Sequence, residues 1–147
     1  MYKYKVTTLS LIATFLFIGV LAAACVLLPS IIGFYLKDQA GAAGIRVALY
    51  VCMYGSVACG AVLSYLLLRI LFNIRKSVVF DRGNVRYAGL ISICCFAVCA
   101  LFFALGFFIP FSFLVAFSAG FIGLIVRVVR NLLREATNIK EENDLTV

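Results

Sequence analysis

The stretch from Ala88 to Val129 reads AGLISICCFAVCALFFALGFFIPFSFLVAFSAGFIGLIVRVV, and it decides the fold of this chain. Its 42 residues carry a single charge, close to the end of the stretch. One helix of that length, at about 1.5 Å per residue, would be roughly twice as long as the ~30 Å hydrocarbon core of a bilayer. The stretch must therefore turn, and Gly106 and Pro110 mark the place. The sequence predicts two membrane-spanning helices, at about 88–109 and 111–129, joined by a tight hairpin.

Two more apolar segments precede this stretch, at about 6–28 and 47–72. Only Arg69 is charged within them, and its long stem lets the guanidinium reach the lipid headgroups. Pro29 follows the first segment and is expected to end it. We therefore predict an all-α fold with one membrane domain, residues 1–147. It is an integral four-helix bundle whose fourth span continues as a cytoplasmic helical extension, the C-terminal tail at 130–147.

The composition agrees with a protein that is surrounded by lipid. Hydrophobic residues make up 65% of the chain, charged residues only 13%, and the mean hydropathy is +1.16. Soluble domains are about half apolar and about a quarter charged, so this chain has too few polar residues to cover an ordinary core. A bilayer accepts such an apolar exterior.

The basic residues predict the orientation of the spans. The formal net charge is +7, and eleven of the thirteen Lys and Arg residues lie at Lys3–Lys5, Arg69–Arg86 and Arg127–Lys140. The opposite side of the membrane would hold only Lys37 and Arg46. Basic segments beside spans are retained in the cytoplasm, so both termini are predicted to be cytoplasmic. Because these charges flank spans, we expect no direct contact with nucleic acid.

The first span has some features of a cleaved signal peptide. Lys3 and Lys5 precede an apolar run that contains Ala22-Ala23-Ala24-Cys25, which resembles a lipoprotein cleavage box. The chain stays apolar after Cys25, however, and we expect the first span to be retained.

Side chains suited to catalysis or metal binding are scarce. The chain has no histidine, and all six acidic residues lie outside the predicted spans. The cysteines lack the spacing of metal-ligand motifs, and cysteines within apolar stretches mostly act as small packing residues. We therefore predict no enzymatic activity, no cofactor and no metal. The six cysteines are Cys25, Cys52, Cys59, Cys94, Cys95 and Cys99.

Small residues recur four apart in two of the spans, where they let helix backbones approach closely in lipid. We favour packing within the chain over a homo-oligomer seam, which the same stripes would permit. The two stripes are Ser56, Gly60 and Ser64, and Ser112, Ala116 and Gly120.

The 73–87 loop and the tail beyond Arg127 are the candidate partner-binding elements. The loop places apolar Val78, Val79 and Phe80 between charges, and the tail turns acidic after an apolar stripe at helical spacing. A contact strip for anionic lipid and a solvated terminus are the alternatives. The candidate residues are Arg75, Lys76, Phe80, Asp81, Asn84, Arg86, Glu141, Glu142, Asn143, Asp144 and Leu145.

Two motifs carry a resemblance to a known family. A Phe-x-x-x-Asn pattern, Phe80 to Asn84, lies between the second and third spans, and the chain closes on Glu141-Glu142-Asn143-Asp144-Leu145-Thr146-Val147. With four spans, this resembles the bacterial membrane family called domain of unknown function 2975. The resemblance implies a four-helix protein of the bacterial inner membrane, encoded beside a very small helix-turn-helix regulator.

These observations lead to two functional hypotheses. The preferred one is a non-enzymatic multi-pass membrane protein that is a regulatory or sensing partner of a small cytoplasmic helix-turn-helix transcription regulator, a DNA-binding protein. The alternative is a small channel, exporter or immunity-type membrane protein. Capture of a small DNA-binding protein would favour the first hypothesis, and solute flux in liposomes would favour the second.

The orientation leads to a first testable prediction. Reporter fusions placed after Lys76 and at Val147 should report a cytoplasmic position, and a fusion at Gly41 should report an external one, because the basic clusters hold their side of the membrane inside. A periplasmic signal from the 73–87 loop would contradict the predicted topology.

Overall fold

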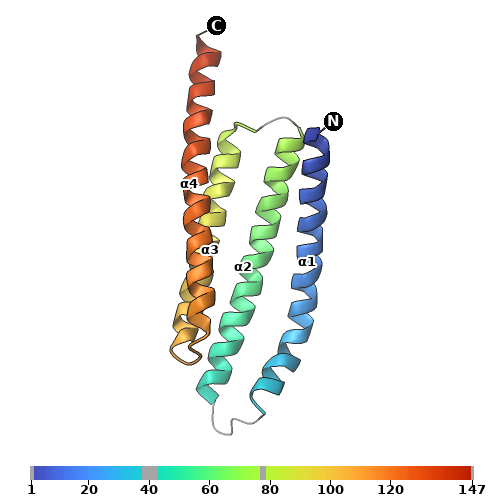
Figure 1. The fold of residues 1–147 in the computed structure, drawn as a ribbon, viewed down its shortest axis with the longest axis vertical. Helices are drawn as coiled ribbons and strands as arrows, with labels where there is room; N and C mark the ends of the chain where they lie inside the picture. The colour runs from blue at the N-terminus through green and yellow to red at the C-terminus, as the bar shows by residue number, and fades with distance from the viewer. Residues whose placement is uncertain (1, 38–42, 77–78, 147) are drawn as a thin grey trace.

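The computed structural model describes residues 2–37, 43–76 and 79–146, with side chains from residue 8 onward. These residues form four helices (Figure 1): α1 (Tyr2–Tyr35), α2 (Ala43–Arg75), α3 (Arg82–Gly106) and α4 (Ser112–Leu145). All four are long and apolar enough to cross a membrane. The all-helical prediction with four candidate spans is confirmed.

One predicted helix end was wrong. Pro29 does not end the first helix, because α1 continues through it to Tyr35. A proline inside a helix removes one backbone hydrogen bond. Packing on both sides of Pro29 offsets that loss, since Leu28 and Ile32 are both buried in the same apolar cluster as Leu49 of α2.

The four helices pack in chain order rather than as a closed bundle. Among the described residues, α1 packs on α2, α2 on α3 and α3 on α4, and no other pair of helices is in close backbone contact. The four predicted membrane helices are therefore arranged as an open row (Figure 1). Lipid tails are as apolar as leucine, so no hydrophobic force draws α1 against α4 to close the row.

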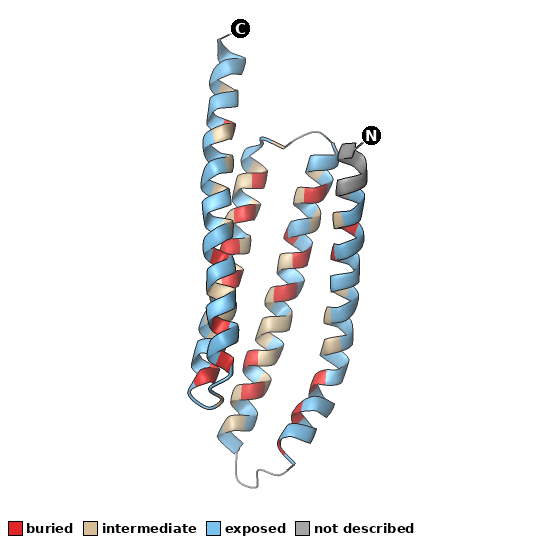
Figure 2. Ribbon diagram, in the orientation of Figure 1, coloured by how far each residue is buried: buried red, intermediate tan, exposed pale blue. Residues whose placement is uncertain are grey.

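Most large apolar side chains lie on the outside of the row (Figure 2). Phe34, Phe117 and Val26 are each more than three-quarters exposed. Such a surface would aggregate in water, whereas a bilayer covers it at no cost. This exposure supports the assignment of the protein to a membrane.

The contact between α3 and α4 depends on small residues. A Cβ atom added at Gly123 would lie 3.1 Å from the Cβ of Cys95, and one at Gly120 would lie 3.2 Å from the Sγ of Cys99. The Ser92 hydroxyl donates a 2.9 Å hydrogen bond to the Gly123 carbonyl across the same contact. The small-residue stripe of the fourth span therefore packs within the chain, as favoured from the sequence.

The hairpin between α3 and α4 is closed by aromatic rings. A Cβ atom at Gly106 would lie 2.8 Å from the ring of Phe113, so glycine lets this ring approach. Phe113 packs edge-on against Phe103 and Phe107, with ring centroids 5.2 and 5.8 Å away. The turn therefore forms at Gly106 to Pro110, where the sequence predicted it, and it sets α4 antiparallel to α3.

The connections place the basic segments at one end of the molecule. The start of α1, the 79–81 segment and the last turns of α4 share that end, and the 107–111 hairpin lies at the other (Figure 1). The last turns of α4 project beyond the other helices. A charged, partly apolar helix end thus extends past the apolar row.

The close contact of α3 and α4 leads to the second prediction. Gly123→Val should lower the thermal unfolding midpoint in detergent, because overpacking of a tight contact costs about 1–3 kcal/mol. Gly19→Val on α1 is the matched control, since a Cβ atom there meets nothing within 4 Å. Equal midpoints for the two variants would mean that the α3–α4 contact tolerates the added side chain.

Candidate functional site

The end of α4 lies against the start of α3. Thr137 is only 2% exposed, and its hydroxyl donates a 2.7 Å hydrogen bond to the Leu133 carbonyl. Leu133 and Ala136 are half-buried on the same side, whereas Leu132 and Ile139 are exposed. The apolar stripe that the sequence predicted is therefore divided, because one part packs on the protein and the other part faces outward.

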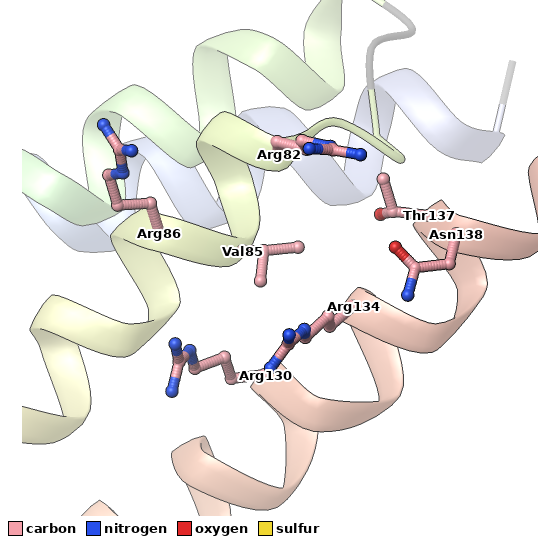
Figure 3. A pocket seen from close by; sticks show the side chains of 7 residues that line it. All are labelled: Arg82, Val85, Arg86, Arg130, Arg134, Thr137 and Asn138. Carbon is pink, nitrogen blue, oxygen red and sulfur yellow. The ribbon is translucent and has the colours of Figure 1, made fainter. Parts of the chain in front are cut away.

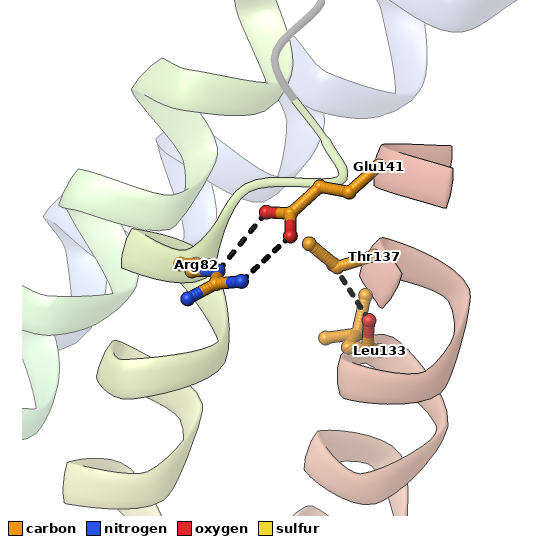
Figure 4. A network of polar contacts seen from close by, with 4 residues as sticks. All are labelled: Arg82, Leu133, Thr137 and Glu141. Carbon is orange, nitrogen blue, oxygen red and sulfur yellow. Dashed lines mark hydrogen bonds and ion pairs between the residues drawn. The ribbon is translucent and has the colours of Figure 1, made fainter. Parts of the chain in front are cut away.

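An ion pair joins the two helices at this end (Figure 4). The Arg82 Nε donates to Glu141 Oε1 at 3.0 Å, and its Nη2 donates to Oε2 at 2.7 Å. It is the one ion pair among the side chains of residues 8–37, 43–76 and 79–146. Side chains as exposed as these, 78% and 43%, add little to the stability of the whole fold, so we expect the pair to affect only the last turns of α4.

The pKa of the Glu141 carboxyl group is changed by its contact with Arg82. Its hydrogen bond from Arg82, and then the charge of the guanidinium, lower its pKa below the usual value for a glutamate, although partial desolvation opposes the shift. A lowered pKa means that the contact is present above the ordinary carboxylate pKa and is lost as pH falls through the lowered value. The Arg82–Glu141 ion pair is therefore expected to weaken at acidic pH.

Besides Glu141, two more of the predicted partner residues make hydrogen bonds within the protein. Asp81 caps α3 by accepting a 3.0 Å hydrogen bond from the Gly83 amide. Asn84 is 2% exposed, donates to the Val79 carbonyl at 2.9 Å and accepts from Asn73 at 2.8 Å. These hydrogen bonds hold the 79–84 segment in place between α2 and α3. Asn84 is therefore not available to a partner, whereas Asp81 is itself exposed.

Glu141 is half-buried and pairs with Arg82, and the remaining predicted partner residues are exposed. Phe80 is 45% exposed beside the start of α3, and Leu145 is 87% exposed at the end of α4. The other exposed members are Arg75, Lys76, Arg86, Glu142, Asn143 and Asp144. Val78 and Val147, which also belong to the predicted motifs, lie outside the described residues.

The sequence did not predict the cavities between α3 and α4. One has a volume of about 320 Å³ and is lined by Arg82, Val85, Arg86, Arg130, Arg134, Thr137 and Asn138 (Figure 3). A second, of about 210 Å³, is lined by Arg86, Gly89, Leu90, Ser92, Ile93, Arg127 and Arg130. The two share Arg86 and Arg130, and together they are called the arginine groove below.

A regular spacing in the sequence could have indicated the groove. Arg82 and Arg86 are four apart, and Arg127, Arg130 and Arg134 are three and four apart, so each set lies along one helix face. The spacing alone does not show that these two faces lie opposite each other. Only the antiparallel contact of α3 and α4 brings them together.

The described side chains contain no group of three His, Cys, Asp or Glu residues arranged to hold a metal ion. The six cysteines are free thiols. Cys95 and Cys99 contact the glycines of α4, which is a packing role.

Comparison with known proteins gave one family match. The family model described as "Protein of unknown function (DUF2975)" matches residues 34–147. The match begins at the end of α1 and includes α2, α3, α4 and both motifs quoted from the sequence. No curated protein and no solved structure matches the chain.

The ion pair leads to the third prediction. Glu141→Gln should speed hydrogen exchange in residues 138–145 at neutral pH, because it removes the charge that holds α4 to Arg82. The wild-type protein should show the same change when the pH falls through the lowered pKa of Glu141. Glu142→Gln is the matched control, because Glu142 makes no ion pair with another described residue. Unchanged exchange in Glu141→Gln would show that the pair does not hold α4.

Proposed function

The chain belongs to the DUF2975 family of proteins of unknown function, and we propose that it is a non-enzymatic regulatory or sensing partner of a small cytoplasmic helix-turn-helix transcription regulator. We place it in the bacterial inner membrane, with both termini in the cytoplasm. The clustering of the basic segments at one end of the molecule supports this orientation.

The observation that carries the proposal is the projecting end of α4. It extends beyond the other helices on the side where the 79–81 segment lies (Figure 1). Leu132 and Ile139 lie on one helix face that leads into this end, and each is more than half exposed. Exposed apolar residues within a charged rim are typical of surfaces that bind proteins.

Phe80 adds an aromatic side chain at the same end of the protein. The 79–84 segment is held by hydrogen bonds of Asn84 to Asn73 and to Val79, so Phe80 is presented from an ordered backbone. A preorganised aromatic anchor loses little conformational entropy on binding. We therefore include Phe80 in the proposed partner surface.

The alternative, a small channel, exporter or immunity-type protein, has less support. A cavity of about 340 Å³ lies at the hairpin end, and its lining is apolar except for Tyr35 and Ser112. Transport paths within spans usually carry ionisable or strongly polar groups. This cavity has none of the charged groups that would mark a path for ions.

The fourth prediction tests the partner surface by crosslinking in intact membranes. Phe80→Ala, and separately Leu132→Ala with Ile139→Ala, should each lower the yield of a crosslinked small DNA-binding protein by about tenfold or more, because buried anchors contribute about 2 kcal/mol or more. Abundance in the membrane fraction should not change, since no basic residue is removed.

The matched control for these variants is Phe117→Ala. Phe117 is also exposed on α4, but it lies within the apolar segment, so its loss should not affect capture. Equal capture by wild type, Phe80→Ala and the double variant would overturn the proposal. Crosslinking only to proteins that do not bind DNA would overturn the regulatory role.

A further inference from the structure

The arginine groove concentrates positive charge that the described protein does not neutralise. Among the described residues, Arg82 alone has a carboxylate partner, and Arg86, Arg127, Arg130 and Arg134 have none. Like charges held this close repel one another, and a bound anion would relieve the repulsion. The lining therefore indicates an anionic ligand.

Arg130 is the side chain best placed to hold that ligand. It extends from α4 toward α3, as does Arg134 (Figure 3), and its Nε atom is buried without a hydrogen-bond partner among the described residues. A buried donor without a partner is unfavourable. The Arg130 guanidinium also has no carboxylate partner among the described residues, and arginine donates to phosphate oxygens through parallel N–H groups, so a phosphate in the groove would pair with this charge.

Gly89 provides the space for this arrangement. A Cβ atom at this position would lie 2.8 Å from the Arg130 Nε and 3.2 Å from its Cζ. Any larger residue would therefore move the guanidinium away from α3. The position of Arg130 depends on a specific contact rather than on general attraction to the surface.

The location of the groove identifies the source of the phosphate. Arg127 is the first charge after the apolar part of α4, so the groove lies where the apolar surface ends and lipid headgroups are expected. Leu90 and Ile93 line the second cavity of the groove, and both side chains are exposed. A basic pocket between spans that adjoins apolar surface suits a phospholipid, because the headgroup binds the arginines and an acyl chain covers the apolar side chains. A free phosphate would leave the apolar side chains uncovered.

We infer that the arginine groove binds the phosphate of an anionic phospholipid, and that an acyl chain of this lipid lies along Leu90 and Ile93. This inference does not depend on the proposed regulatory role, because it concerns the sides of α3 and α4 that face each other. The partner surface proposed above uses the opposite side of α4 and Phe80.

The test uses the purified full-length protein in a neutral detergent, with thermal stability measured during titration. The three probes are phosphatidylglycerol, phosphatidylcholine and inorganic phosphate. Phosphatidylglycerol should raise the unfolding midpoint saturably, at a concentration at least about tenfold lower than either other probe. Equal stabilisation by inorganic phosphate would assign the groove to free phosphate, and equal stabilisation by phosphatidylcholine would remove the preference for anionic lipid. Either result would overturn the inference.

Three variants separate a specific site from general electrostatic attraction. Arg130→Gln should weaken the effect of phosphatidylglycerol about tenfold, as expected for the loss of a charge-assisted hydrogen-bonding group. Gly89→Ala keeps the net charge but displaces the guanidinium, so it should also weaken binding. Arg75→Gln removes one exposed charge at the same end, outside the groove, and should bind like wild type.

Each variant is compared with its own midpoint in the absence of lipid, so a change in basal stability does not mimic a change in binding. If Arg75→Gln weakens the effect as much as Arg130→Gln, the lipid recognises only net charge and the site does not exist. If Gly89→Ala and Arg130→Gln both bind like wild type, the groove is not the binding site.

Discussion

The close contact between α3 and α4 is the constraint on which the rest of this end of the structure depends. Gly120 and Gly123 let the two backbones approach, and the hairpin at Gly106 sets the helices antiparallel. The antiparallel register then brings Arg82 opposite Glu141. It also brings two arginine-bearing faces into one groove. A wider separation of the helices would remove both the ion pair and the groove.

The two sides of α4 have different environments because of this contact. The side with Thr137 packs on α3, and the side with Leu132 and Ile139 remains outside. A single amphipathic stripe in the sequence thus becomes one packed surface and one free surface. The packed side forms part of the arginine groove, where we propose that a lipid binds. The free side forms part of the surface where we propose that a protein partner binds. The two proposals can therefore be tested separately.

The candidate site was only partly predictable from the sequence. Phe80 and Leu145 are exposed, as a partner surface requires, but Asp81 and Asn84 are used within the protein. Turn residues have this ambiguity, because the same side chains that cap a helix can also bind a partner. Arg130 was not among the predicted site residues, since its role depends on Gly89 of another helix, and a one-dimensional spacing does not reveal that neighbour.

The sequence by itself determined that the chain forms four apolar helices with a turn between Gly106 and Pro110. Length and hydropathy suffice for this, because a backbone in lipid must satisfy its own hydrogen bonds and a helix does so locally. Only the tertiary structure decided that the helices pack as an open row, that α1 continues past Pro29 and that the arginines of α3 and α4 meet. Lipid supplies no hydrophobic force between helices, so their contacts depend on shape, and shape arises from residues far apart in the chain.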